Sequence, residues 1–115
     1  MSYDVWLEAD TGGPERACLS ALSLNYTSNV SPMWSLALGA NLGDLIQEAE
    51  KDGRQAGRLA GLLAAGVEKM RAEPSAYLAM NPENGWGCYE GALEFLDKIR
   101  QACEAHPWAY LRVSR

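Results

Sequence analysis

The sequence predicts an α+β fold in which helices cover one face of a small antiparallel sheet of about three strands, in the order β-β-α-α-α-α-β. Residues 3–9 and 108–114 alternate between apolar and polar side chains, which is typical of half-buried strands. Residues 54–71 and 89–105 carry apolar stripes with helical spacing. At 115 residues the chain is long enough to bury its own core, so we expect a single domain over residues 1–115.

Two strands are expected before the first helix, at residues 3–9 and 15–29. The turn at residues 10–14 joins them and contains two glycines and a proline. Because this connection is longer than a two-residue hairpin loop, the sequence leaves the register of the pair open. The C-terminal strand at residues 108–114 is expected to pair beside the first strand.

Four helices are expected between the second and third strands. Ser31 and Pro32 predict the start of the first one, as N-cap and first helical residue, and Gly39 ends it. Asp44 is the predicted N-cap of a second short helix, which Gly53 breaks. The third helix has the clearest apolar stripe, which consists of Ala56, Leu59, Leu63, Val67 and Met70.

Three glycines lie within the predicted third helix, at Gly57, Gly61 and Gly66. Each weakens a helix by about 1 kcal/mol relative to alanine, so we expect close packing against a neighbouring element at these positions. A short helical turn at residues 74–80 and the helix at residues 89–105 follow.

The composition argues against several classes of function for this chain, among them nucleic-acid binding and metal binding. The formal net charge is −5, and a chain of this balance is not expected to bind nucleic acid directly, because that requires clustered Lys and Arg. Three cysteines at no metal-like spacing and a single histidine indicate free thiols in a reducing compartment and no metal site. No signal-peptide pattern or membrane-spanning run is present, so we expect a cytoplasmic protein without membrane contact.

The first candidate binding segment is a row of polar residues on alternate positions of the second strand, Asn25, Thr27 and Asn29, followed by Trp34. Alternate residues of a strand share one face of a sheet, and Asn is disfavoured in strands. The amides and the hydroxyl suit a polar ligand, and Trp34 offers a stacking surface. The structural alternative is that Asn29 caps the next helix and Trp34 belongs to the core.

The second candidate segment is the loop at residues 81–89, in which Asn84, Trp86 and Tyr89 are the candidate ligand contacts. Glycines flank Trp86, so the backbone there can approach another group closely. Trp86 and Tyr89 would form an aromatic wall, and the N-terminus of the following helix would offer free N–H groups to an anion. In the structural alternative, the indole of Trp86 fills the core.

No set of residues indicates catalysis, so we expect a non-enzymatic protein without a cofactor. Cys88 has no basic partner that would activate its thiol, and His106 is placed to complement the dipole at a helix C-terminus. The remaining acidic pairs are spaced as surface charges.

Both segments resemble blocks of a family of small proteins from phage, prophage and actinobacterial genomes. Residues 25–34 are similar to an Asn-Ile-Thr-Tyr-Asn-Tyr-Gly-Pro-His-Phe type of segment, from which Ser28, Val30 and Met33 depart. Residues 81–91, which read Asn-Pro-Glu-Asn-Gly-Trp-Gly-Cys-Tyr-Glu-Gly, resemble the second block. The family has no established activity, so the resemblance implies a phage-linked context and host cytoplasm rather than a particular chemistry.

Two functions follow from these observations. The first is a phage-type accessory protein that binds a small polar ligand, nucleotide-derived ligands among the candidates, between the two segments. The alternative is an interaction module that inhibits or modulates a host protein, with Trp6, Trp86 and Trp108 as exposed anchors. The open edges of a three-stranded sheet are also compatible with homo-oligomers.

Overall fold

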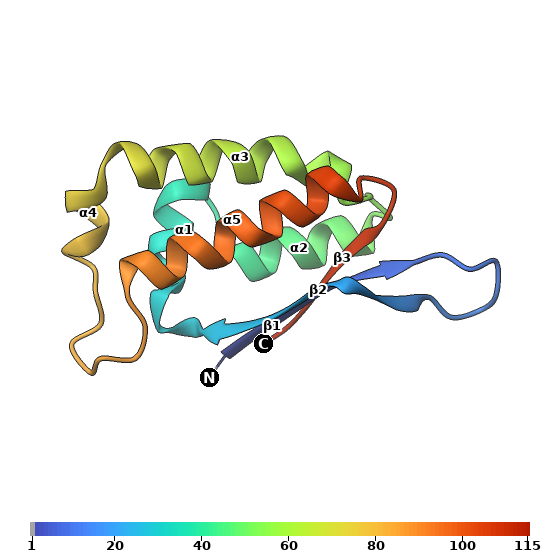
Figure 1. The fold of residues 1–115 in the computed structure, drawn as a ribbon, viewed down its shortest axis with the longest axis horizontal. Helices are drawn as coiled ribbons and strands as arrows, with labels where there is room; N and C mark the ends of the chain where they lie inside the picture. Colours follow the sequence, from blue (N-terminus) through green and yellow to red (C-terminus); the bar gives the residue numbers. More distant parts are fainter. Residues whose placement is uncertain (1) are drawn as a thin grey trace.

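The structure is a computed structural model that describes residues 2–115, with the exception of the side chain of Ala21. Its elements are β1 (Ser2–Ala9), β2 (Ala17–Thr27), the 3-10 helix η1 (Ser28–Val30), α1 (Ser31–Leu38), α2 (Leu42–Lys51), α3 (Gly57–Ala72), α4 (Pro74–Leu78), α5 (Tyr89–Ala105) and β3 (Tyr110–Ser114). The helices lie on one side of an antiparallel sheet, and the other side of the sheet is uncovered (Figure 1). The predicted α+β class is confirmed.

Within residues 2–115 the strands form one three-stranded sheet with the order β2-β1-β3. β1 is therefore the central strand, and β3 pairs with it as the sequence predicts. Val5 lies opposite Leu24 on one side and Val113 on the other, so apolar residues of all three strands face the helices together. β3 begins at Tyr110, later than predicted, because residues 107–108 form a turn after α5.

A bulge in β2 sets the register that the sequence leaves open. Trp6 lies opposite Ser23, whereas Leu7 lies opposite Leu19, so three residues of β2 have no partner in β1. An odd number of extra residues reverses which positions of a strand face the core. Leu19 and Leu22 are an odd number of positions apart in β2. Because of the bulge, Leu22 faces the helices while Leu19 lies opposite Leu7.

Two predicted helix caps are wrong by a few residues. The N-cap of α1 is Val30, and Ser31 already belongs to the helix. The N-cap of α2 is Asn41 instead of Asp44, because the Asn41 Oδ1 atom accepts a hydrogen bond from the Asp44 N–H at 3.0 Å. The carboxylate of Asp44 pairs with Arg115.

An aromatic cluster joins α1, α5 and the sheet. The ring centroid of Trp34 lies 5.0 Å from that of Phe95 and 5.5 Å from that of Tyr3, and Tyr26 lies 5.8 Å from Phe95. Stacked and tilted pairs at these distances add to the free energy gained from burial alone. The end of β2 is therefore fixed to α5 through this cluster.

The predicted close packing at glycines is confirmed at two of the three positions in α3. A Cβ atom at Gly57 would lie 2.7 Å from the Pro107 Cβ, and one at Gly66 would lie 2.5 Å from Leu38 Cδ2. The prediction is wrong for Gly61, which has open space around it.

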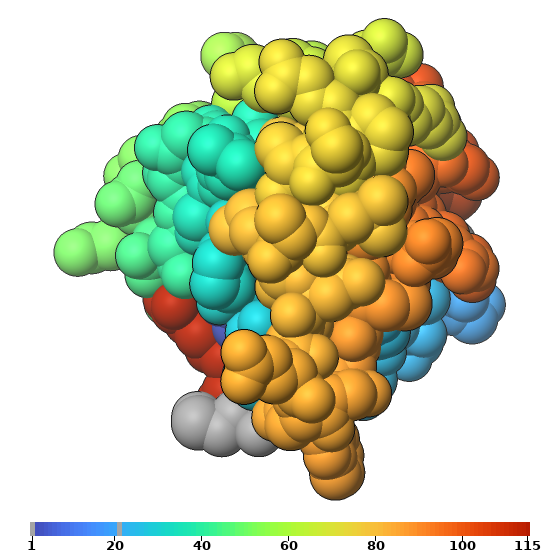
Figure 2. Space-filling view, turned by 90° about the vertical axis from the view of Figure 1, so that its left-hand side faces the viewer, coloured from blue at the N-terminus to red at the C-terminus, as the bar shows by residue number. Residues whose placement is uncertain are grey.

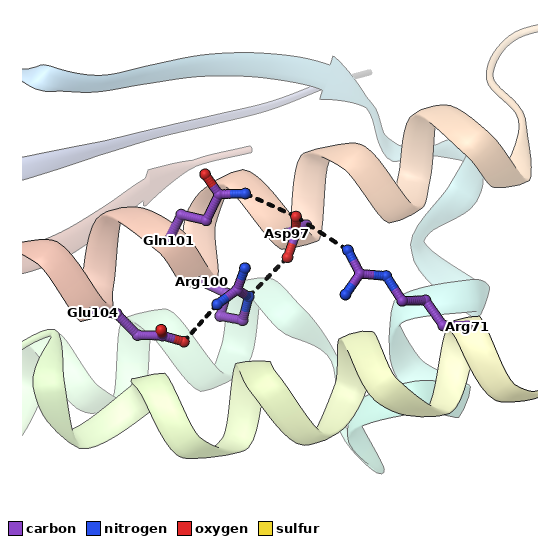
Figure 3. Close-up of polar contacts among 5 residues, drawn as sticks. All are labelled: Arg71, Asp97, Arg100, Gln101 and Glu104. Atoms are coloured by element: carbon purple, nitrogen blue, oxygen red, sulfur yellow. Dashed lines mark hydrogen bonds and ion pairs between the residues drawn. The ribbon is translucent and has the colours of Figure 1, made fainter.

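A polar network joins α3 to α5 on the side away from the sheet (Figure 3). Asp97 accepts hydrogen bonds from Arg100 at 2.7 Å and Gln101 at 2.8 Å, and Arg71 of α3 lies 3.3 Å from its carboxylate. Arg100 also donates to Glu104 at 2.8 Å. Burial alone would raise the pKa of Asp97, but these hydrogen bonds and the two positive charges outweigh it and hold the pKa below its usual value.

The β1–β2 hairpin extends beyond the helices at one end, and the molecule measures 46 × 26 × 22 Å (Figure 1). At the opposite end, the loop between α4 and α5 lies below α4 and stands out from the surface (Figure 2). Among the helices of residues 2–115, none combines the length and the apolar character needed to cross a bilayer.

Candidate functional site

The two segments singled out from the sequence meet at the end of β2. They form an open groove of about 520 Å³, and its lining residues are Ser2, Asn25, Thr27, Asn29, Asn84 and Trp86. Its lining comes from β1, β2 and η1 on one side and from the loop between α4 and α5 on the other. Five of the seven predicted contact residues are therefore neighbours in space, although about fifty-five positions separate the two segments in the sequence.

A glycine contact brings the loop against the strand. Gly87 has φ +98, and a Cβ atom there would lie 2.6 Å from Thr27 Cγ2 and 2.8 Å from Val30 Cγ1. Only a residue without a side chain fits this conformation at this distance. The loop backbone therefore lies directly on the end of β2 and on η1.

A second glycine, Gly91, allows a similarly close approach in the first turn of α5. A Cβ atom at Gly91 would meet the phenol ring of Tyr26, at 2.6 Å from its Cζ atom. The Tyr26 hydroxyl oxygen accepts a hydrogen bond from the Cys88 N–H at 3.1 Å. Burial raises the pKa of Tyr26 above its ordinary value of 10.0, so this phenol keeps its proton to a more alkaline pH than a free tyrosine does.

Trp86 is the most exposed aromatic residue of the site. Its side chain is 68% exposed, so the alternative in which it fills the core is wrong. The backbone N–H of Trp86 donates to Asn84 Oδ1 at 3.0 Å, and Gly85 and Gly87 on either side have positive φ. This turn holds the indole at the surface as a wall of the groove.

The polar groups of the groove are only partly used within the protein. Asn25 Nδ2 donates to Asp4 Oδ1 at 2.8 Å, and Thr27 Oγ1 accepts from the Asn29 N–H at 3.3 Å. Within the described part of the chain, the side-chain amide of Asn29, Asn84 Nδ2 and Asn25 Oδ1 form no hydrogen bond. The groove therefore offers both donors and acceptors to a ligand.

Trp34 and Tyr89 do not line the groove, and their predicted role as ligand contacts is wrong. Trp34 is 0% exposed, and its Nε1–H donates to the Ala92 carbonyl at 3.0 Å. Tyr89 is 7% exposed, and its hydroxyl donates to the Met70 carbonyl at 2.5 Å. Both rings pack in the core because their helices turn them toward the sheet and toward α3.

The predicted anion site at the start of α5 is also not free. The Tyr89 N–H donates to Asn81 Oδ1 at 2.9 Å, and the Gly91 N–H donates to Cys88 Sγ at 3.4 Å. With the Cys88 N–H bound to Tyr26, three N–H groups at this end already have acceptors inside the protein. Among residues 2–115 no Lys or Arg lines the groove, so a phosphate finds no cationic side chain in this part of the protein.

The sequence reasoning missed Ser2, which lines the groove, and Tyr26 and Gly91, which hold its two sides together. Tyr26 and Gly91 lie within the quoted segments, but the sequence contains no signal that one packs against the other. Ser2 faces Thr27 across the β1–β2 pair, and only the register reveals this.

The three tryptophans proposed as anchors of a protein-binding surface are far apart. Trp86 and Trp108 lie beyond opposite ends of α5, a helix of 17 residues. Trp108 is 51% exposed, whereas Trp6 is half-buried on the uncovered face of the sheet. They do not form one patch.

Comparisons of the chain with protein-family models, with the curated proteins and with the solved structures gave no significant match.

Proposed function

We propose that the chain is a non-enzymatic protein that binds a small, uncharged polar ligand in the groove between the end of β2 and the α4–α5 loop. The observation that supports this most strongly is the combination of an exposed indole, Trp86, with the side-chain amide of Asn29 and the Nδ2 group of Asn84, which have no hydrogen-bond partner in the described part of the chain. An indole attracts a flat or apolar ligand face, and the amides supply hydrogen bonds around it.

The charges favour a neutral ligand over a nucleotide. The lining residues that the structure describes include no Lys or Arg, and Asp4 is bound to Asn25 at the edge of the groove. A phosphate group would lose its hydration without gaining a cation in return. Nucleotide-derived ligands, which the sequence leaves open, are therefore the less favoured class.

The residues that line the groove also support binding without catalysis. Its residues are Asn, Ser, Thr and Trp, and none of these side chains titrates between pH 5 and 8. General acid–base catalysis needs such a group within hydrogen-bond reach of the reacting atom. The phage-linked context implied by the resemblance stays a prediction.

The test is a binding screen with uncharged cell metabolites, fractionated by ion exchange and followed by ligand-observed NMR and tryptophan fluorescence. Retained compounds are then titrated against Trp86→Ala, Asn29→Ala and Trp108→Ala. Loss of stacking or of an amide hydrogen bond is expected to weaken binding about tenfold or more.

Trp108→Ala is the matched control, because Trp108 is also an exposed tryptophan but lies at the other end of α5. The proposal predicts unchanged affinity for this variant. Equal losses for Trp86→Ala and Trp108→Ala, or retained affinity in both groove variants, would contradict it.

A further inference from the structure

A second cavity adjoins the groove on the uncovered face of the sheet. It has a volume of about 460 Å³, and Asp4, Trp6, Ser23 and Asn25 contribute to its lining. Asn25 also lines the first groove, so the two cavities share a wall. The side chain of Asn25 is bonded to Asp4 at this junction.

The register of β1 and β2 places the two cavities along one line. On the outer face of the sheet the pair Ser2–Thr27 is followed by Asp4–Asn25 and then by Trp6–Ser23. From the first pair to the third is four residues of strand, about 13 Å. A single ring cannot reach across this distance, whereas a chain of several rings can.

The second cavity has its own aromatic surface, which is held in place. The Trp6 Nε1–H donates to Glu8 Oε2 at 2.8 Å, and Arg112 donates to Glu8 Oε1 at 2.9 Å. The guanidinium of Arg112 lies 5.9 Å from the Trp6 ring and is paired with Glu50 at 2.7 Å. An indole fixed by packing and hydrogen bonds loses little entropy when a ligand stacks on it.

We infer that the ligand is elongated, and that it is an uncharged oligosaccharide lying across both cavities from Trp86 to Trp6. This inference rests on the proposed function and adds the class and the length of the ligand. Sugar rings present an apolar C–H face to an indole and hydroxyl groups to amides and carboxylates, which matches two tryptophans separated by Asp4 and Asn25.

The other linear polymers fit this path less well. A nucleic acid needs cations along its backbone. Among the described residues neither cavity has a Lys or Arg in its lining, Asp4 lies between them, and Arg112 beside Trp6 is already paired with Glu8 and Glu50. A peptide that adds a strand needs an open sheet edge, whereas this path runs across the flat face of β1 and β2, where the backbone groups point along the sheet.

The inference is tested by calorimetric titration of the whole chain with two neutral series, β-1,4-linked glucose and β-1,4-linked N-acetylglucosamine, from the monosaccharide to the hexasaccharide. Affinity is expected to rise at least tenfold from the monosaccharide to the longer members and then to level off. Trp6→Ala and Ser23→Lys are expected to remove this gain, so that the longer members bind no more tightly than the shortest ones.

Ser23→Lys keeps the result interpretable if Trp6→Ala fails to fold, because Ser23 is exposed beside Trp6 and a lysine there obstructs the path without removing any packing. Trp86→Ala is expected to weaken binding of every length. The inference would be overturned if the affinity did not depend on the length of the sugar, or if Ser23→Lys weakened the binding of short and long sugars equally. It would also be overturned if a pool of peptides, and not the sugars, showed length-dependent binding.

Absence of binding by both sugar series would also overturn it. The proposed function is judged separately, on neutral metabolites and on the Trp86→Ala and Asn29→Ala variants. If a single-ring compound still binds and its binding depends on Trp86, the proposed function is supported and the inference of an elongated ligand is rejected.

Discussion

Gly91 is the residue at which the two halves of the candidate groove are in closest contact. Its Cα faces the phenol ring of Tyr26, with space for a hydrogen but not for a methyl group. Gly61 also lies in a helix, but a Cβ atom there would meet no other atom within 4 Å. The two glycines therefore separate the effect of helix propensity from the effect of tertiary packing.

Gly91→Ala is expected to destabilise the protein by about 1 to 3 kcal/mol, because the new methyl group overlaps Tyr26 and forces β2 and α5 apart. Gly61→Ala is expected to stabilise it by up to about 1 kcal/mol, since alanine is the better helix former and meets nothing. Urea unfolding of both variants measures the two changes. Stabilisation by both substitutions would show that Tyr26 does not pack on Gly91.

At the scale of elements, the contact between α3 and α5 combines glycine packing with the charge network around Asp97. Asp97 lies between Arg71 of one helix and Arg100 of the other and is largely shielded from water. Because its pKa is depressed in the folded state, its contribution to stability is present above the unfolded pKa and is lost as the pH falls through the folded value.

Asp97→Asn is expected to lower the free energy of unfolding at pH 7 by about 1 to 2 kcal/mol, because two arginines lose their shared carboxylate. The difference from the native chain is expected to shrink as the pH falls below about 4 and to disappear only below the depressed pKa of Asp97, where both proteins lack this charge. Urea unfolding across pH 3 to 7 measures it.

The control for Asp97→Asn is Glu94→Gln, which removes an exposed carboxylate of α5 that pairs with Lys98 four residues on. Exposed pairs of this kind contribute less than about 0.5 kcal/mol. Similar losses for both variants at pH 7 would mean that the position of Asp97 between α3 and α5 has no special effect.

The sequence predicts the elements well wherever the signal is a periodicity. The stripe of α3 from Ala56 to Met70 is buried as expected, and Gly39 ends α1 in a left-handed conformation. The bulge in β2 could not be predicted, because alternation along residues 17–27 does not show which residues lack a partner in another strand. The predicted N-cap of α2 is wrong because Asn41 and Asp44 are both good caps, and only the backbone geometry decides between them.

For the whole molecule, one thiol and two phenols that are shielded from water predict how the free energy of unfolding changes at alkaline pH. Burial raises the pKa of Cys103 from 9.0 to about 12, and burial also raises the pKa of Tyr77 and of Tyr26. In each case the folded state retains a proton that the unfolded chain releases. The free energy of unfolding must therefore fall as the pH rises above about 9.

Cys103→Ala is expected to flatten this alkaline decline, because the variant has no buried thiol to ionise on unfolding. At pH 7 the variant is less stable by about 1 kcal/mol, since a small void replaces the sulfur. Chemical denaturation at pH 7, 9 and 10 measures both effects. A decline as steep as that of the native chain would mean that other groups dominate it.

The candidate site was predictable only to some extent. The polar row on β2 and the turn around Trp86 could be read from composition and spacing, and both line the groove. Trp34 and Tyr89 could not be separated from them, because an aromatic ring suits a core as well as a ligand. The two segments come together because Gly87 and Gly91 pack against residues of β2 and η1. Such long-range contacts leave no local pattern in the sequence.

The central position of β1 has a consequence for the order in which the protein can assemble during its synthesis. β1 is made directly before β2, yet its second neighbour, β3, pairs Leu111 with Leu7 and is made about a hundred residues later. Until β3 is made, β1 has one unpaired edge, and Val5 and Leu7 lack their neighbours Val113 and Leu111. The three-stranded sheet is therefore completed only after the helices between β2 and β3 have been made, and this non-local pairing is expected to be a late step of folding.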